Sequence, residues 1–253
     1  MRNDLGKNMN ITEVISHKYS KNHEKMKLLK EQFSAKGYVK LPGFLNNDVF
    51  EAISSDVWKL HRHRTRKDFV MPELNTDRKM SVISGKDVIN QSDIIPSLYA
   101  NHELRSWISY LVGTDVHTVM HNDEFLVLNF LDGKRDTHGW HLDDPRYALI
   151  IIIESPEKNA GGQIEFICDW KRLAKEESFS PDRNIEYGIE ICERKGQLNS
   201  DTLQTGDCYL LEAGEVMHRV SPMSADGSRK ALNFGFDDRR FRVYGQTATK
   251  LYA

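Results

Sequence analysis

Residues 147–153, YALIIII, constrain the fold more than any other part of this 253-residue chain. The run contains no polar break, which is typical of a strand whose two faces are both buried. Two histidines and two aspartates come directly before it, in THGWHLDDPR. Burying such groups costs several kcal/mol, about 2 to 7 even for a neutral polar group, unless they are paired or bound to a metal. The sequence therefore predicts a functional cluster at the start of a covered strand.

The rest of the chain predicts helices followed by strands. Apolar residues recur at helical spacing in residues 26–33, 50–60 and 104–111, and the first and last of these stripes stop at Gly37 and Gly113. From His117 onward, short β-like runs with Gly or Pro punctuation replace this pattern. We expect an α+β fold, an all-β core with flanking helices.

We expect one domain over residues 1–253, because β-rich domains of this length are often single. Its parts would be a mostly helical N-terminal part at 1–115, a β core at 116–240 and a tail at 241–253. Residues 171–200, polar and weakly patterned, would be an insertion in the core.

Composition argues against several function classes. The formal charge of -2 gives no general attraction to nucleic acid or membrane, and we interpret the basic run at 61–67 as a solvated helix end. Three cysteines without a CxxC pair support neither a disulfide framework nor a structural zinc site. The first 14 residues lack the apolar core of a signal peptide, and no apolar run reaches the length of a membrane span. We expect a cytoplasmic protein with no membrane or nucleic-acid partner.

The triplet His141-Leu142-Asp143 is the first candidate for metal binding. Because residues i and i+2 of an extended chain share a face, His141 and Asp143 can offer two ligands together. A chain with ten histidines contains about one such triplet by chance, and a second one, at 121–123, serves as a decoy. Context therefore has to separate the two.

His218 supplies that context. It lies on a short Val-x-His-x-Val alternation in residues 216–220, where it can provide a third ligand; the alternative is an ordinary buried histidine. Two His and one carboxylate on one face of a metal form the facial triad of non-haem Fe(II) oxygenases. The decoy triplet lacks a matching histidine at the expected separation.

Arg229, 11 residues after His218, opens a strand in KALNFGF. An arginine among apolar residues needs a carboxylate partner, which its planar fork binds through two hydrogen bonds, unless it forms a surface ion pair. The succession of HxD, a Gly-Gly strand, His-x-Val-x-Pro and Arg resembles the Fe(II)/2-oxoglutarate dioxygenases over about residues 35–240. The resemblance implies a double-stranded β-helix of the jelly-roll type, Fe(II), O₂, and 2-oxoglutarate bound through Arg229.

The chain resembles more closely the radical halogenases of free amino acids such as lysine, and in particular their hydroxylating relatives. In halogenating members, Gly or Ala replaces the carboxylate of the triplet and leaves a coordination position for chloride. Asp143 fills that position here. The resemblance places five residues around an amino-acid substrate: Arg78, Glu124, His138, Asp144 and Asn233. Taken alone, Arg78 suits a carboxylate, and the acids Glu124 and Asp144 suit an added cation, although each could instead form an exposed ion pair.

We therefore expect an Fe(II)/2-oxoglutarate-dependent hydroxylase of a free amino acid, with L-lysine as the first candidate. The alternatives are an oxygenase of another basic amino acid, of a protein or of a nucleic acid, and a non-catalytic cupin-like binding module. The carbon hydroxylated and the oligomeric state, for which a homodimer is one option, are left open by the sequence.

Overall fold

The structure is a computed structural model that describes residues 13–252 apart from 21, 184, 226 and 246. The prediction that the N-terminus carries no signal peptide concerns mainly residues 1–12, which lie outside the described residues. The helices are α1 (His17–Ser20), α2 (His23–Lys36), α3 (Asn47–Leu60), the 3-10 helix η1 (His61–His63), α4 (Gly85–Ile89), α5 (Ile94–Ala100), α6 (His102–Val112), α7 (Trp170–Glu176), α8 (Glu186–Arg194) and α9 (Thr247–Tyr252). The strands are β1 (Tyr38–Leu41), β2 (Thr65–Met71), β3 (Thr76–Ile83), β4 (His117–Thr118), β5 (Leu126–Leu131), β6 (Thr137–His141), β7 (Tyr147–Glu154), β8 (Ile164–Ile167), β9 (Asn199–Asp201), β10 (Cys208–Leu211), β11 (Met217–Val220) and β12 (Arg229–Asp237).

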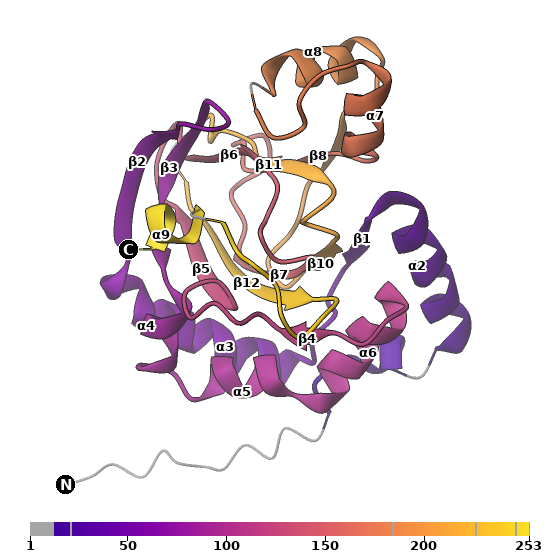
Figure 1. The fold of residues 1–253 in the computed structure, drawn as a ribbon. Helices are drawn as coiled ribbons and strands as arrows, with labels where there is room; N and C mark the ends of the chain where they lie inside the picture. The colour runs from indigo at the N-terminus through magenta and orange to yellow at the C-terminus, as the bar shows by residue number, and fades with distance from the viewer. Residues whose placement is uncertain (1–12, 21, 184, 226, 246, 253) are drawn as a thin grey trace, which may run out of the picture.

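These strands form one curled antiparallel sheet with helices packed outside it (Figure 1). Ten strands follow the order β1-β10-β7-β12-β5-β3-β6-β11-β8-β9, while β2 pairs with β3 and β4 pairs with β12. Helices α3, α5 and α6 lie together along one side of the sheet (Figure 1). The expected all-β core with flanking helices is confirmed.

Strand β7 is buried on both faces, as its unbroken apolar sequence predicts. Leu149 and Ile151 pack in a core cluster with residues of the helices α3, α5 and α6. Ala148 and Ile150 point the other way, into a second cluster inside the curled sheet. This strand therefore separates the helical layer from the interior where the site lies.

The helices predicted from apolar spacing are present as α2, α3 and α6. Helix α2 ends at Gly37, whose φ of 63° is left-handed and whose N–H donates to the Phe33 carbonyl. Helix α6 ends in the same way at Gly113, with φ 78°. Glycine adopts this conformation without the steric penalty of a Cβ atom, which is why both stripes stop where they do.

The first 115 residues, expected to be mostly helical, also supply the strands β1, β2 and β3. The hairpin of β2 and β3 joins the same sheet as the later strands, and β1 pairs with β10. The basic run at 61–67 is largely exposed, as expected, but only its start is helical, because Thr65 begins β2. The single-domain organisation stays a prediction.

The insertion at 171–200 is more ordered than its polar sequence indicates. It carries α8 and most of α7, whose apolar residues pack with Trp140 and Met217 of the core strands. Among the described residues, no helix has the length and apolar character needed to cross a membrane. The cytoplasmic location stays a prediction.

Candidate active site

The residues of the HxD triplet lie where β6 ends. His141 is the last residue of β6, and its Nδ1 lies 2.7 Å from the Gly139 carbonyl oxygen. Asp143 follows outside the strand, where its backbone N–H donates to the Ala213 carbonyl at 2.9 Å. The Nε2 of His141 is then 3.3 Å from Oδ1 of Asp143. The two side chains converge, as the i, i+2 spacing predicts.

His218 reaches the same point from β11, which pairs with β6 so that His218 lies opposite His141. Its Nδ1 lies 2.9 Å from the Val216 carbonyl oxygen, and its Nε2 lies 3.8 Å from Oδ1 of Asp143. One donor atom from each of the three side chains lies within 4.8 Å of the other two. The structure thus brings the three predicted ligands together.

Hydrogen bonding leaves both imidazoles ready to bind a metal. A carbonyl oxygen only accepts, so Nδ1 of each ring carries the proton and Nε2 keeps its lone pair toward Asp143. Burial lowers the pKa of His218 to about 4, and so keeps it neutral at neutral pH. Burial opposes ionisation of Asp143, but the neighbouring His141 and His218 outweigh it and lower the pKa of this carboxyl. Two neutral imidazoles and a carboxylate on one face fit Fe(II) and leave coordination positions for other ligands.

Arg229, the first residue of β12, is only 3% exposed and faces the interior. Its Nη2 has no hydrogen-bond partner among the described residues, and none of their carboxylates forms an ion pair with it. Burial lowers the pKa of Arg229, and the neighbouring Tyr209 raises it by a smaller amount. An inner chamber of about 30 Å³ connects Arg229 with the triad residues His141, Asp143 and His218. A buried guanidinium without a carboxylate is suited to an anionic ligand.

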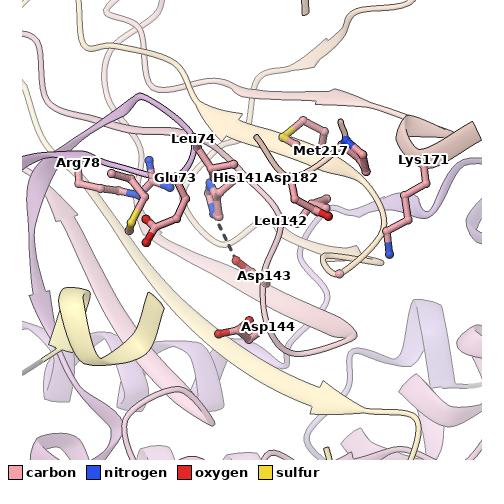
Figure 2. Close-up of a pocket in the computed structure, with 13 residues that line it drawn as sticks. Glu73, Leu74, Arg78, His141, Leu142, Asp143, Asp144, Lys171, Asp182 and Met217 are labelled. Carbon is pink, nitrogen blue, oxygen red and sulfur yellow. Dashed lines mark ion pairs between the residues drawn. The ribbon is translucent and has the colours of Figure 1, made fainter. Parts of the chain in front are cut away.

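A larger cavity of about 310 Å³ opens on the other side of the triad (Figure 2). Its walls come from the hairpin of β2 and β3, from the loop at 141–144 and from the insertion, with Gly214 and Met217 completing them. Figure 2 shows Glu73 and Leu74 on one side of His141, and Lys171 and Asp182 on the other. His141 and Asp143 line both spaces, so the triad stands at their junction.

The five predicted substrate residues are distributed over these two spaces. Arg78 and Asp144 line the outer cavity, and His138 and Asn233 line the inner chamber. Arg78 is fully buried, with Nη1 donating to Thr76 and to the Asp77 carbonyl.

Glu124 lines neither space, but its carboxyl is close enough to Asp144 and Asp143 to respond to their charges. Burial, followed by those two charges, raises the pKa of Glu124 to about 9. One of its oxygens, Oε2, is buried without a hydrogen-bond partner. A carboxyl in this state can accept a cation that displaces its proton.

The decoy triplet does not join the site. His121 and Asp123 lie in the loop before β5, where the Asp123 N–H donates to Nδ1 of His121 at 3.3 Å. In the part of the chain that the structure describes, the candidate metal group contains only the triad.

Two polar residues of the inner chamber escaped sequence reasoning. Tyr209 on β10 hydrogen-bonds Arg229, and Asn129 on β5 has a buried Oδ1 without a partner. Asn129 is the one polar residue in the apolar strand LVLNFL, which is a usable signal. Tyr209 lies in CYLL, where nothing distinguishes it from an ordinary core residue.

Comparison with known proteins agrees with this site. A family model described as Halogenase D matches residues 21–248. The chain belongs to the halogenase D family. This match confirms the resemblance to the halogenases. A comparison with curated proteins found no match to this chain.

Solved structures share the fold of this halogenase D family member at low identity. The epimerase SnoN from nogalamycin biosynthesis, in complex with Fe3+, alpha ketoglutarate and nogalamycin RO, is 14% identical, with a TM-score of 0.64 over 86% of this chain and 85% of that chain. A Pseudomonas putida prolyl-4-hydroxylase is 14% identical, with a TM-score of 0.54 over 85% and 99%. HygX from Streptomyces hygroscopicus, with nickel and 2-oxoglutarate bound, is 14% identical, with a TM-score of 0.59 over 92% and 94%.

These similarities confirm the expected jelly-roll fold. Family, fold and donor set together identify a non-haem Fe(II)/2-oxoglutarate-dependent dioxygenase that uses O₂.

Proposed function

We propose that the protein hydroxylates an unactivated side-chain carbon of a free basic amino acid, with L-lysine as the first candidate. The observation that carries the proposal is the position of Asp143, between the two histidines and at the edge of a cavity that also contains Arg78 and Asp144. Such a cavity would offer one anion-binding and one cation-binding side chain beside the oxidising centre.

His141, Asp143 and His218 would hold the metal through two Nε2 atoms and one carboxylate. When bound, the iron would use O₂ and 2-oxoglutarate to convert a C–H bond into C–OH, with succinate and CO₂ as the other products. Because both rings are fixed by their Nδ1 hydrogen bonds, the protein presents its ligands without having to reorder them.

Arg229 would hold the distal carboxylate of 2-oxoglutarate in the inner chamber. Its unpartnered Nη2 is one of the donors available for a two-point contact, and Tyr209 lies beside the same guanidinium. The co-substrate would then extend from Arg229 toward the triad, since both line this chamber.

The outer cavity would receive the amino acid. Arg78 suits its carboxylate, because the fork is held in place by two hydrogen bonds from Nη1. Asp144 and Glu124 suit an ammonium group, and His138 and Asn233 would complete the polar contacts from the inner side. A neutral side chain would leave the two acids without a partner, so we propose that neutral amino acids bind poorly.

Asp143 would decide the type of reaction. A carboxylate that ligates the metal occupies a coordination position and repels a second anion there. Chloride is therefore disfavoured, and hydroxylation is the proposed outcome in this member of the halogenase D family.

The test uses the full chain, prepared without oxygen, loaded with Fe(II) and 2-oxoglutarate, and mixed with each of the twenty amino acids or ornithine in a chloride buffer. After exposure to O₂, succinate and product mass are measured. We expect lysine to gain one oxygen and no chlorine, with ornithine and arginine next. A chlorinated major product would refute hydroxylation, and succinate release stimulated only by a protein would refute the small-molecule substrate.

A further inference from the structure

The residues after β12 form a strap, defined here as residues 238–245, that leads back to the site. Figure 1 shows this segment running from the β4 end of the sheet to α9, which lies beside β3. Beyond the strap, Leu251 of α9 is buried in a cluster with Met80 and Val82 of β3. The strap is therefore anchored at its far end on the strand that carries Arg78.

Tyr244 fixes the strap to the body of the protein near the site. Its hydroxyl donates to Oδ2 of Asp237 and accepts the backbone N–H of Met120 at 3.0 Å. Asp237 is only 1% exposed and also accepts the backbone N–H of Arg146 at 3.1 Å, so the hydroxyl binds to a rigid point. One phenol oxygen thus joins the strap to β12 and to the segment before β5.

Gly245, the next residue, touches a residue of the outer cavity. Its N–H donates to Oδ2 of Asp144 at 3.1 Å. A Cβ atom built on Gly245 would lie 3.1 Å from Oδ1 and 3.3 Å from Oδ2 of the same carboxylate. The strap therefore rests directly on the Asp144 carboxylate.

This contact restricts the direction of the carboxylate. The χ2 angle of an aspartate is broad when nothing holds it. A hydrogen bond from Gly245 to Oδ2 fixes one oxygen, and leaves Oδ1 available to a ligand in the cavity. The quality of the cation site then depends on how firmly Gly245 is held, which is the task of the adjacent Tyr244.

We propose that Tyr244 is a positioning residue for substrate recognition: its hydroxyl holds the strap so that the Gly245 N–H orients Asp144 toward the cationic group of the substrate. The inference rests on the proposed function, because it assumes that Asp144 receives that group. Tyr244 lines neither cavity, yet in this proposal it strengthens the binding of a basic amino acid. The binding of 2-oxoglutarate should not depend on Tyr244.

Tyr244→Phe removes the hydroxyl and keeps the ring, so the full-length variant should fold. In protein loaded with Fe(II) and 2-oxoglutarate without oxygen, the Kd for lysine, or for whichever amino acid binds the wild type most tightly, should rise about tenfold, as for the loss of one hydrogen bond that orients a charged group. The Kd for 2-oxoglutarate should not change. Hydrogen exchange at the strap should accelerate, which reports the loosening without any turnover.

Gly245→Ala tests the contact between the strap and Asp144, because the added methyl group would press on that carboxylate. The variant should bind the same amino acid more weakly and leave 2-oxoglutarate binding unchanged. Two matched controls should leave both Kd values unchanged: Tyr187→Phe, at an exposed ring on α8, and Gly133→Ala, at a glycine with open space around it. If wild type binds the amino acid and Tyr244→Phe binds it equally well, the positioning role is refuted while the proposed function stands. If wild type binds no amino acid, the proposed function fails, and this inference fails with it.

Discussion

The ring of His138 stacks on that of His141, with centroids 3.9 Å apart and planes inclined by 24°. Burial, and then the neighbouring His141, keep the pKa of His138 well below its usual range, so the ring is neutral. Its Nε2 is buried without a hydrogen-bond partner. A buried polar atom in this state is costly unless a ligand satisfies it, which supports the proposed contact of His138 with the substrate.

His138→Phe should keep the stacked ring and lose the nitrogen. We expect intact Fe(II) binding, since His141 keeps its neighbour, and about a tenfold loss of affinity for the amino acid. His138→Ala, which removes the ring as well, should weaken both. Equilibrium dialysis for the metal and calorimetry for the amino acid separate the two effects. Equal amino-acid affinity in wild type and His138→Phe would remove His138 from the substrate site.

His218→Ala should abolish stoichiometric Fe(II) binding and 2-oxoglutarate turnover, because the metal would lose one of its two imidazole ligands. The fold should be largely kept, since an open catalytic site contributes little to the core. Asp123→Ala in the decoy triplet is the matched control and should bind a full equivalent of iron. Wild-type metal content in His218→Ala would show that the ligands lie elsewhere.

Removal of the Arg229 guanidinium should raise the 2-oxoglutarate concentration required for half-maximal succinate release by more than about tenfold, since charge-assisted hydrogen bonds contribute about 1.5 to 3 kcal/mol each. Arg229→Lys should recover only part of this, because an ammonium lacks the planar fork. A milder route is Gly162→Ala, whose Cβ would approach Cδ of Arg229 to 3.3 Å at a φ of 74°. Gly196→Ala has a similar φ of 64° and open space, so it controls for backbone strain. An unchanged requirement in Arg229→Ala would assign the co-substrate to another cation.

The pH dependence of substrate binding should reveal Glu124. Its pKa of about 9 means that the carboxyl is protonated at neutral pH in the free protein. A bound ammonium group favours the carboxylate, so binding releases a proton and the affinity for lysine rises with pH from about 7 to about 8.5, by up to about tenfold per unit. Glu124→Gln should flatten this rise and bind lysine less well, with little effect on leucine. A rise of the same size in Glu124→Gln would place the linked proton elsewhere.

Asp143→Gly should lose most hydroxylation, because the metal loses its only carboxylate ligand from the chain. It also opens a coordination position and removes a negative charge, so a chlorinated product should become detectable by mass spectrometry in a chloride buffer. Asp143→Glu keeps the charge and should show no chlorination. If Asp143→Glu and Asp143→Gly chlorinate equally, the carboxylate is not what excludes the halide.

Local patterns in the sequence predicted the elements whose environment is uniform along their length. The unbroken run in β7 predicts two buried faces because every side chain meets a core, and α2 and α6 end at glycines that adopt a left-handed φ. The triad was predictable because two of its members lie two residues apart in the sequence, and the third lies on a short alternating strand.

The missing parts depend on contacts between distant segments. Strand β2 is exposed and charged because it pairs only with β3 at the outside of the sheet, so its sequence reads as a solvated surface. Tyr209 becomes a site residue only when β10 is placed near Arg229, and no local pattern encodes that approach. The contact of Gly245 with Asp144 spans 101 residues and is equally invisible to spacing arguments.

The walls of the outer cavity have a consequence for how this protein can change. The triad lies on or beside β6 and β11, inside the hydrogen-bonded sheet, whereas Glu73 and Leu74 lie in a hairpin turn and Asp182 lies in the insertion. Turns and insertions tolerate altered length and sequence far better than central strands do. Selection, or a protein engineer, can therefore exchange the rim for another one and retain the oxidising centre intact, so the outer shape of the cavity can change while Arg78, His138 and Asn233 keep their places on the strands.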